Sequence, residues 1–240
     1  MYRKVYFDSL PSTNTFLKQN YKNYEDKTVI ICDSQTQGHG RLGRSWESST
    51  DNIALSILLK PQISVDSISR LSLMTSAVIF EVINKLTNNV LIKWPNDILV
   101  NSKKVSGILL ESIISSKVEA LIIGIGVNVN QASFSEDLNK KATSLYLETN
   151  TKYNKMTIID DIITTFDKFY RKYLSDKHNY LDICRWHSAI ISRNISVNNE
   201  DVYVLDIKDN GALLVRDANG LINEIAYGEV SLTNEYKNVD

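Results

Sequence analysis

Apolar residues recur at steps of three and four in two long segments, and this spacing predicts two amphipathic helices. They are expected over residues 68–86 and 156–174, with a shorter helix over residues 179–188. Ser12-Thr13-Asn14 predicts the start of another short helix, because such side chains cap the free amides of a first turn. The apolar positions of the two long helices are Ile68, Leu71, Met74, Val78, Val82 and Leu86, then Ile159, Ile163, Phe166, Tyr170 and Tyr173.

Short apolar runs between polar breaks predict strands in the first half of the chain. These runs are residues 3–8, 28–33, 53–59, 90–93, 98–100, 104–113 and 118–129. Asn101-Ser102-Lys103 and Ser115-Ser116-Lys117 are polar turns between the last of these strands, so this part is expected to form an antiparallel meander. The pattern predicts an α+β fold whose sheet is mixed or antiparallel.

The character of the chain changes after Ser192, where short strands follow one another closely. The strands are expected at residues 195–197, 202–207, 212–216 and 221–226. Asn210-Gly211 and Asn219-Gly220 lie between them, and Asn-Gly is a strong signal for a tight hairpin turn. We therefore expect a main domain at residues 1–191 and a small β-barrel at residues 192–240.

The composition is that of a folded globular protein, with 43% hydrophobic and 23% charged residues among 240. The net charge of -1 gives no general attraction to nucleic acid or to a membrane surface, and we expect neither as a partner. No signal core and no run of about 20 apolar residues is present. Two cysteines and three dispersed histidines provide neither a disulfide framework nor a metal cluster, so we assign no metal ligand and expect a cytoplasmic protein.

Residues 34–52 form a long polar segment between two predicted strands, and loops of this kind in compact domains are commonly functional. The stretch from Gly38 to Trp46 contains three glycines, two arginines and one tryptophan in nine residues. Glycine lets the backbone approach a ligand closely, and arginine offers a planar fork of donors to phosphate or carboxylate. The stretch predicts a site for an anionic ligand. The alternative is a mobile surface loop with solvated arginines.

Three other segments carry weaker signals. Lys93-Trp94-Pro95-Asn96-Asp97 predicts a corner between two strands, and an ordinary turn explains it equally well. After Lys104, Gly107 removes a side chain from an apolar strand, either for a close approach or for a bulge. Gly124-Ile125-Gly126-Val127-Asn128 resembles half of a dinucleotide-binding motif, but no third glycine opens a helix, and we reject a Rossmann fold.

Together, these segments make the chain resemble the biotin–protein ligases over nearly its whole length. The resemblance rests on Ser12-Thr13-Asn14, Gln35, Gly38-His39-Gly40-Arg41-Leu42-Gly43-Arg44 with Trp46, Lys93-Trp94-Pro95-Asn96-Asp97, Lys104 with Gly107, and Gly124-Ile125-Gly126-Val127-Asn128. Lipoate ligases share the broad fold, but the glycine-arginine loop and the Lys-Trp-Pro-Asn-Asp corner are distinctive of the biotin branch. The resemblance implies a mixed, largely antiparallel sheet with flanking helices, as in class II aminoacyl-tRNA synthetases, and a C-terminal SH3-like barrel.

The resemblance also implies roles for individual residues. Arg41 and Lys104 would be catalytic, while Arg44, Trp46 and Asn128 would bind the nucleotide. The biotin pocket would be lined by Ser12, Thr13, Gln35, Gly38, His39, Gly40, Arg41, Lys104 and Gly107. His39 departs from the family pattern, which usually has arginine there, and neutral histidine offers fewer donors than arginine.

The implied reaction joins biotin to ATP as biotinyl-AMP and then transfers biotin to a lysine of an acceptor protein. Biotin's carboxylate and the α-phosphate repel each other, so Arg41, Lys104 and Arg44 are expected to offset that repulsion. Mg²⁺ is expected with ATP, as nucleotidyl chemistry generally requires it. Residues 37–46 are expected to close over the adenylate and exclude water. Cys32 and Cys184 are interpreted as packing residues and not as nucleophiles.

The expected partner is a biotin carboxyl carrier protein or an equivalent biotin-accepting domain, and the enzyme is expected to be a monomer or a homodimer. Many family members begin with a winged-helix DNA-binding domain, whereas this sequence begins at the catalytic domain. We therefore expect a single-function ligase that is not a repressor. Two alternatives remain open: a lipoate–protein ligase, and a non-catalytic binding module that uses the C-terminal barrel.

Overall fold

A seven-stranded sheet forms the centre of the computed structural model, which describes residues 1–175 and 179–232. Its strand order is β1-β2-β3-β7-β6-β5-β4. β1 and β2 run parallel, and the other neighbouring strands are antiparallel, as the prediction of a mixed sheet requires. The strands are β1 (Arg3–Leu10), β2 (Thr28–Gln35), β3 (Ile53–Leu59), β4 (Val90–Lys93), β5 (Asp97–Val100), β6 (Lys103–Ile114) and β7 (Val118–Val127).

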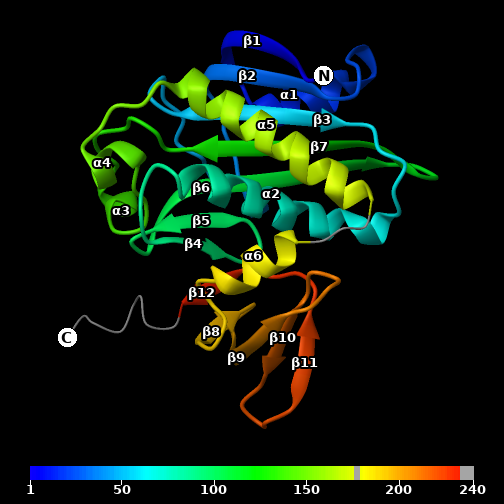
Figure 1. The fold of residues 1–240 in the computed structure, drawn as a ribbon, viewed down its shortest axis with the longest axis vertical. Helices are drawn as coiled ribbons and strands as arrows, with labels where there is room; N and C mark the ends of the chain where they lie inside the picture. Colours follow the sequence, from blue (N-terminus) through cyan, green and yellow to red (C-terminus); the bar gives the residue numbers. More distant parts are fainter. Residues whose placement is uncertain (176–178, 233–240) are drawn as a thin grey trace.

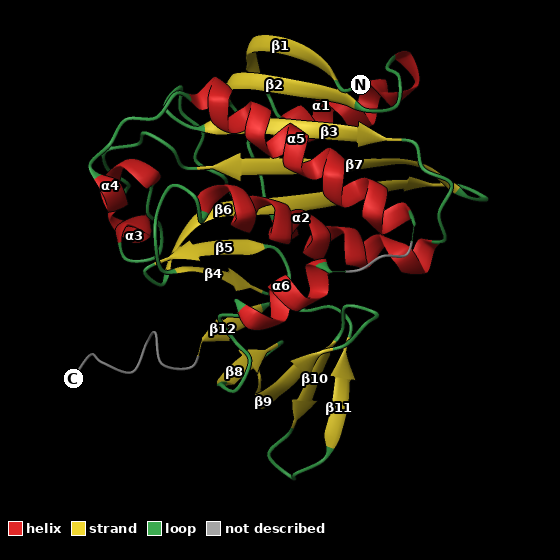
Figure 2. Ribbon diagram, viewed as in Figure 1, coloured by secondary structure: helices red, strands yellow, loops and turns green. Residues whose placement is uncertain are grey.

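Helices cover both faces of this main sheet (Figure 2). The α-helices of the structure are α1 (Thr13–Asn20), α2 (Ile68–Ile83), α3 (Glu136–Asn139), α4 (Leu145–Thr149), α5 (Lys155–Leu174) and α6 (Tyr180–Trp186). α1 packs on one face, where Leu17 joins Ile122 in a small apolar cluster. α2 and α5 cover the other face and form the main core with Ile123 and Ile125. Successive side chains of β7 point to opposite faces, so one strand serves both clusters.

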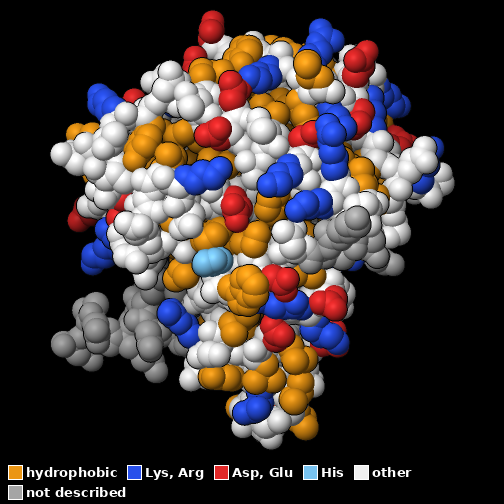
Figure 3. Space-filling view, viewed as in Figure 1, with side chains coloured by type: hydrophobic (Ala, Val, Ile, Leu, Met, Phe, Trp, Pro, Cys, Tyr) orange, Lys and Arg blue, Asp and Glu red, His pale blue; other side chains and the backbone are white. Residues whose placement is uncertain are grey.

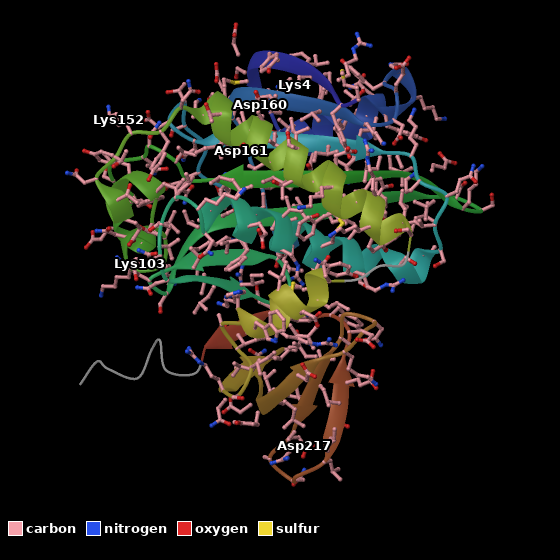
Figure 4. The ribbon with its side chains drawn as sticks, in the orientation of Figure 1. Lys4, Lys103, Lys152, Asp160, Asp161 and Asp217 are labelled. Carbon is pink, nitrogen blue, oxygen red and sulfur yellow. The ribbon has the colours of Figure 1, made fainter. Side chains whose placement is uncertain are left out.

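The apolar face of α5 is the one that the sequence spacing predicted. Phe166 on this face is fully buried. Asn154 caps the helix, because its side chain accepts from the backbone amides of Met156 and Thr157. At the opposite, exposed side, Asp160 forms an ion pair with Lys4 of β1 (Figure 4). The helix therefore buries one side against the main core and ties its polar side to the edge strand.

A second, five-stranded antiparallel sheet occupies the C-terminal part of the chain (Figure 1). Its order is β11-β10-β9-β8-β12, so β11 and β12 are its edges. The strands are β8 (Asn194–Val197), β9 (Glu200–Ile207), β10 (Leu213–Arg216), β11 (Ile222–Ile225) and β12 (Val230–Leu232). Gly211 and Gly220 adopt φ values of +87° and +82° in the two predicted turns, a region that glycine occupies without strain.

Two groups of polar contacts hold the C-terminal sheet against the main sheet. The indole N–H of Trp94 donates to the carbonyl oxygen of Gly211 over 3.0 Å, and Trp94 is buried. Arg185 of α6 donates to the carbonyl oxygen of Ile207 and forms an ion pair with Asp209, both at 2.8 Å. The Lys-Trp-Pro-Asn-Asp corner is therefore a contact between the two sheets as well as a turn.

The differences from the predicted elements occur in short or terminal segments. α2 ends at Ile83, and the backbone amide of Leu86 instead bonds Ile83 in a tighter turn. α3 and α4 were not predicted, because helices of four and five residues are too short to show apolar periodicity. β12 was also missed. This three-residue strand exists through its pairing with β8, and such long-range pairing leaves no local pattern.

Within the described ranges, no helix has the length and apolar character needed to cross a bilayer. Acidic and basic side chains are interspersed on the face shown in Figure 3, where exposed apolar atoms also occur on the C-terminal part. The exposed apolar residues of that part include Leu221, Ile222 and Tyr227. The visible face therefore shows mixed charge rather than a patch of one sign.

Phe166→Ala should lower the free energy of unfolding by about 3–5 kcal/mol, since it removes a buried ring from the main core. Urea denaturation followed by circular dichroism measures this change. Met156→Ala is the matched control, because Met156 lies in α5 with 39% of its surface exposed. A Phe166 variant as stable as this control would contradict the assignment of α5 to the core.

Candidate functional site

The first turn of α1 brings polar groups to the α1 face of the main sheet. Ser12 caps the helix, with its side-chain oxygen accepting from the Thr15 amide at 3.4 Å. Thr13 donates both its backbone N–H and its hydroxyl to Oε1 of Gln35, at 2.8 and 3.1 Å. These two bonds orient the Gln35 carboxamide and direct its Nε2 toward Gly38, where an added Cβ would lie 3.0 Å from Nε2.

Asn14 and Ser56 extend this polar network into the sheet, and both are buried. The Ser56 hydroxyl lies 2.7 Å from Oγ1 of Thr13 and 2.6 Å from Oδ1 of Asn14. Asn14 donates from Nδ2 to the carboxylate of Glu111 over 2.9 Å. Gly124 makes this packing possible, because a Cβ there would lie 2.4 Å from Oδ1 of Asn14.

Three glycines leave part of the α1 face of β6 and β7 without side chains, and we call Gly107, Gly124 and Gly126 the glycine floor. Gly107 and Gly126 are direct cross-strand partners, so both face the same side. The indole of Trp46 lies on this floor. A Cβ at Gly126 would come within 2.5 Å of the Trp46 ring, and a Cβ at Gly107 would lie 3.2 Å from it.

Lys104 lies beside the same floor. Its Nζ is 5.5 Å from the centre of the Trp46 ring and 2.7 Å from Oδ1 of Asp97. The side chain of Lys104 is 34% exposed. Partly exposed ion pairs contribute only about 0–1 kcal/mol to stability. The contacts of Lys104 therefore serve mainly to place its ammonium group at the floor.

The glycine-arginine loop is an ordered, hydrogen-bonded turn. The amide of Trp46 donates to the Gly38 carbonyl at 2.9 Å, and the Gly40 amide donates to the Arg44 carbonyl at 2.7 Å. A single 3-10 turn, Arg41–Gly43, forms its tip. These bonds disfavour the alternative of a loop without structure of its own, and they hold Trp46 against the glycine floor.

The two arginines of the loop point toward the C-terminal sheet and the corner. Arg41 donates to Oδ1 of Asn96 at 3.2 Å and to the carbonyl oxygen of Gly228 at 2.8 Å. Arg44 forms an ion pair with Glu229 at 2.5 Å, although 68% of its side chain is exposed. Segments far apart in the sequence therefore meet at this loop.

Adjacent residues of the corner connect the two predicted catalytic groups. Asn96 binds Arg41, and the next residue, Asp97, pairs with Lys104. Asn96 is itself held by β6, since its Nδ2 donates to the Ile108 carbonyl at 2.7 Å and its carbonyl accepts from the Ile108 amide at 2.9 Å. The corner thus fixes the positions of both cations relative to β6.

The remaining predicted residues have less direct connections to the floor. Asn128 is buried and donates to the Thr143 carbonyl at 3.0 Å, so its observed contact anchors the segment before α4. Nδ1 of His39 lies 3.3 Å from the carbonyl oxygen of Gln37, within the loop itself. The structure joins Thr13, Gln35, Gly38, Trp46, Gly107 and Lys104 through direct contacts.

Neither cysteine has the environment of a nucleophile. Cys32 and Cys184 are both buried. Burial raises the pKa of the Cys184 thiol to about 12, and burial also raises the pKa of Cys32. Thiols in this state are protonated and unreactive at neutral pH. No group of three or more His, Cys, Asp or Glu side chains suited to a metal ion occurs within residues 1–175 and 179–232.

Several residues of the site were not given roles from the sequence. Ser56 carried a signal, because it is a serine inside an otherwise apolar strand. Gly124 and Gly126 belong to the Gly124-Ile125-Gly126-Val127-Asn128 motif, and their spacing of two predicts that they share a face. Asn14, Asn96 and Glu111 gave no such signal alone, since their contacts are with residues distant in the sequence.

Comparison with known proteins shows that this chain is similar to ligases. Residues 6–128 match the model of the biotin/lipoate A/B protein ligase family. The bifunctional ligase/repressor BirA of Bacillus subtilis is 34% identical over 230 residues, covering 90% of this chain and 70% of that protein. The biotin–[acetyl-CoA-carboxylase] ligase of Paracoccus denitrificans is 29% identical over 206 residues, covering 80% of this chain and 85% of that protein.

A solved structure shows the same fold. The biotin protein ligase from Aquifex aeolicus in complex with biotin and ATP superposes with a TM-score of 0.85 and 27% identity. The match covers 96% of this chain and 98% of that one. The similarity therefore includes the C-terminal sheet as well as the main sheet.

Gly126→Ala should displace the indole of Trp46, because the added Cβ would lie 2.5 Å from its ring atoms. We expect a changed near-ultraviolet circular dichroism spectrum and altered tryptophan emission in a protein that remains folded. Gly40→Ala is the control, since the nearest atom to its added Cβ is 3.8 Å away. Spectra that match the control would show that Trp46 does not lie on the glycine floor.

Proposed function

This chain belongs to the biotin/lipoate A/B protein ligase family, and we propose that it activates biotin with ATP and transfers it to a lysine of an acceptor protein. The observation that carries the proposal is the placement of Lys104 beside Trp46 on the glycine floor. The Trp46 ring, which covers Gly107 and Gly126, suits stacking of a flat ligand, and the ammonium group of Lys104 beside it suits a carboxylate. Relatives named as biotin ligases favour biotin over lipoate.

The end of biotin opposite its carboxylate, which carries the ureido group, is assigned to the first turn of α1. Gln35 holds its Oε1 toward Thr13, so its Nε2 donors are directed toward Gly38. Fixed donors of this kind recognise an amide-like or ureido oxygen because a buried acceptor needs a partner. Ser12, Gly40 and His39 complete the proposed biotin-binding set, with His39 supplying fewer donors than an arginine would.

The first chemical step brings together two anions. A carboxylate oxygen of biotin attacks the α-phosphorus of ATP, the bond to the β-phosphate bridging oxygen breaks, and pyrophosphate leaves. Arg41 and Lys104 compensate the negative charge that accumulates, and fixed cations in a partly dry site do this without reorganisation. In the second step an acceptor lysine amine attacks the acyl carbon, and AMP leaves with the electron pair of the broken bond.

The nucleotide side is assigned to Arg44, Trp46 and Asn128. The indole N–H of Trp46 is buried and has no hydrogen-bond partner among the described residues, and buried donors are normally satisfied. A ligand acceptor atom would satisfy it. Mg²⁺ is commonly held by substrate phosphates with one or two carboxylates, so a cage made by the protein alone is unnecessary. When bound with ATP, it would neutralise phosphate charge.

The two proposed domains have different roles in this reaction. Residues 1–191 would carry the acid and nucleotide sites, and residues 192–240 would support the loop from outside. The acceptor would be a biotin carboxyl carrier protein or an equivalent domain, approached by a monomer or homodimer. No group in the described site is required as a covalent nucleophile, which agrees with the burial of Cys32 and Cys184.

ATP–pyrophosphate exchange tests the proposal. Label should pass from pyrophosphate into ATP when biotin is present, and lipoate at the same concentration should support little exchange. Exchange with lipoate alone would identify a lipoate ligase. A lack of exchange with both acids in folded protein would favour a non-catalytic binding module.

Arg41→Gly should release biotinyl-AMP at least about tenfold faster, because hydrogen bonds to a charged group contribute about 1.5–3 kcal/mol. Stopped-flow dissociation of the adenylate measures the rate, and labelling of bystander proteins reports its escape. Arg41→Lys keeps the positive charge and should show a smaller effect. An unchanged dissociation rate in Arg41→Gly would remove this residue from the site.

Lys104→Ala should slow biotin-dependent exchange about 100-fold, because one fixed donor at a developing charge contributes on that scale. Lys103→Ala is the control, since the adjacent Lys103 instead donates to the Asn139 carbonyl (Figure 4). Equal exchange rates in the two variants would exclude Lys104 from charge compensation.

A further inference from the structure

A cavity of about 300 Å³ lies between α2 and the C-terminal sheet, apart from the glycine floor. We call it the intersheet pocket. Apolar side chains from the main sheet, α2 and the C-terminal part form most of its walls. These apolar side chains include Ile68, Leu73, Pro95, Ile108, Leu110 and Tyr227. Ile108 and Leu110 are even-numbered residues of β6, so they point away from the α1 face that carries Gly107.

Three polar side chains in these walls already have partners. The Trp94 indole N–H donates to Gly211 at 3.0 Å, and the Ser72 hydroxyl lies 3.4 Å from the Pro95 carbonyl. The Arg41 guanidinium donates to Asn96 and to the Gly228 carbonyl. An occupant therefore gains mainly by burying apolar surface, and the volume suits an apolar side chain.

Arg41 connects the intersheet pocket to the acid site. The same side chain lines the pocket and contacts Asn96, and the next residue, Asp97, pairs with Lys104. The pocket thus adjoins the cationic end of the site, where the acyl group of the adenylate would be formed. A molecule that presents an amine to that acyl group must approach this part of the surface.

The second reaction step requires such a molecule. An extended chain advances by about 3.3–3.6 Å per residue, so residues two positions from the target lysine lie within about 7 Å of it along the chain. The acceptor must therefore cover the surface around Arg41. Tyr227, at the pocket, is 81% exposed, and an exposed aromatic beside an apolar cavity is typical of a protein docking surface.

We propose that the intersheet pocket receives an apolar side chain of the biotin-accepting protein and so positions its lysine beside Arg41. This inference rests on the proposed function and adds a binding site for the second substrate. It predicts that filling the pocket impairs transfer to a protein and leaves formation of the adenylate intact.

Ser69→Phe fills the pocket from an exposed position on α2, which a folded protein should tolerate. The probe is the unbiotinylated biotin carboxyl carrier domain of an acetyl-CoA carboxylase. We expect the KM for this carrier to rise at least about tenfold, the loss expected when one apolar side chain is no longer buried. Biotin-dependent pyrophosphate exchange and transfer from the adenylate to hydroxylamine should stay within about twofold of wild type.

Ser116→Phe is the matched control, because Ser116 is an exposed serine in the turn between β6 and β7. Tyr227→Ala provides a second variant that removes surface instead of filling the cavity, and it should raise the same KM. Melting temperatures equal to wild type would show that both variants are folded.

Equal carrier KM values for Ser69→Phe, Tyr227→Ala and Ser116→Phe would overturn the inference. A matching loss of transfer to hydroxylamine would place the defect in the acid site and would also overturn it. So would loss of a wild-type dimer in sedimentation, since the occupant would then be a second copy of the chain. Absence of exchange in wild type is a different result, which would reject the proposed function itself.

Discussion

The site depends on the absence of side chains at three positions on one face of two neighbouring strands. Gly124 leaves space for Asn14, while Gly107 and Gly126 leave space for the Trp46 ring. With an alanine at Gly126 or Gly124, the added carbon would lie about 2.5 Å from existing atoms, closer than van der Waals contact allows. The polar network of α1, the position of the loop and the place of any flat ligand all follow from this constraint.

The two faces of the main sheet differ in how much apolar core they carry. α2 and α5 bury a continuous apolar core on one face, and this core supplies most of the hydrophobic stabilisation. The α1 face has a smaller apolar cluster, and it also carries the buried polar residues Ser56 and Asn14 and the glycine floor. β6 and β7 contribute to both because their side chains alternate. A rigid core therefore supports a site whose own ion pairs are partly exposed and contribute little to folding.

The glycine-arginine loop is held in position by contacts with both the main sheet and the C-terminal part of the chain. Its backbone turn holds Trp46 on the floor, while Arg41 and Arg44 reach residues 228–229 beside β12. Gly228 must be small there, because an added Cβ would lie 2.7 Å from Val197. The C-terminal sheet therefore has a structural part in the site although it contributes nothing to the floor. This arrangement also explains why Trp94, Arg41 and the C-terminal segment meet around one pocket.

Local patterns in the sequence determined the α+β class, the bounds of most long elements and the loop that carries the arginines. The buried positions of a helix or strand must be apolar, and this leaves a pattern in the sequence. The positions of α5 and β3 could therefore be predicted without a structure. The glycine-arginine loop, the corner and Lys104 were identified from the order of motifs. The sequence did not reveal that Asn96 connects Arg41 to β6, that Ser56 joins Thr13 to Asn14, or that β12 exists. Those features arise from contacts between residues far apart in the chain, and only the packing of α1 and the C-terminal sheet on the main sheet decides which distant side chains meet.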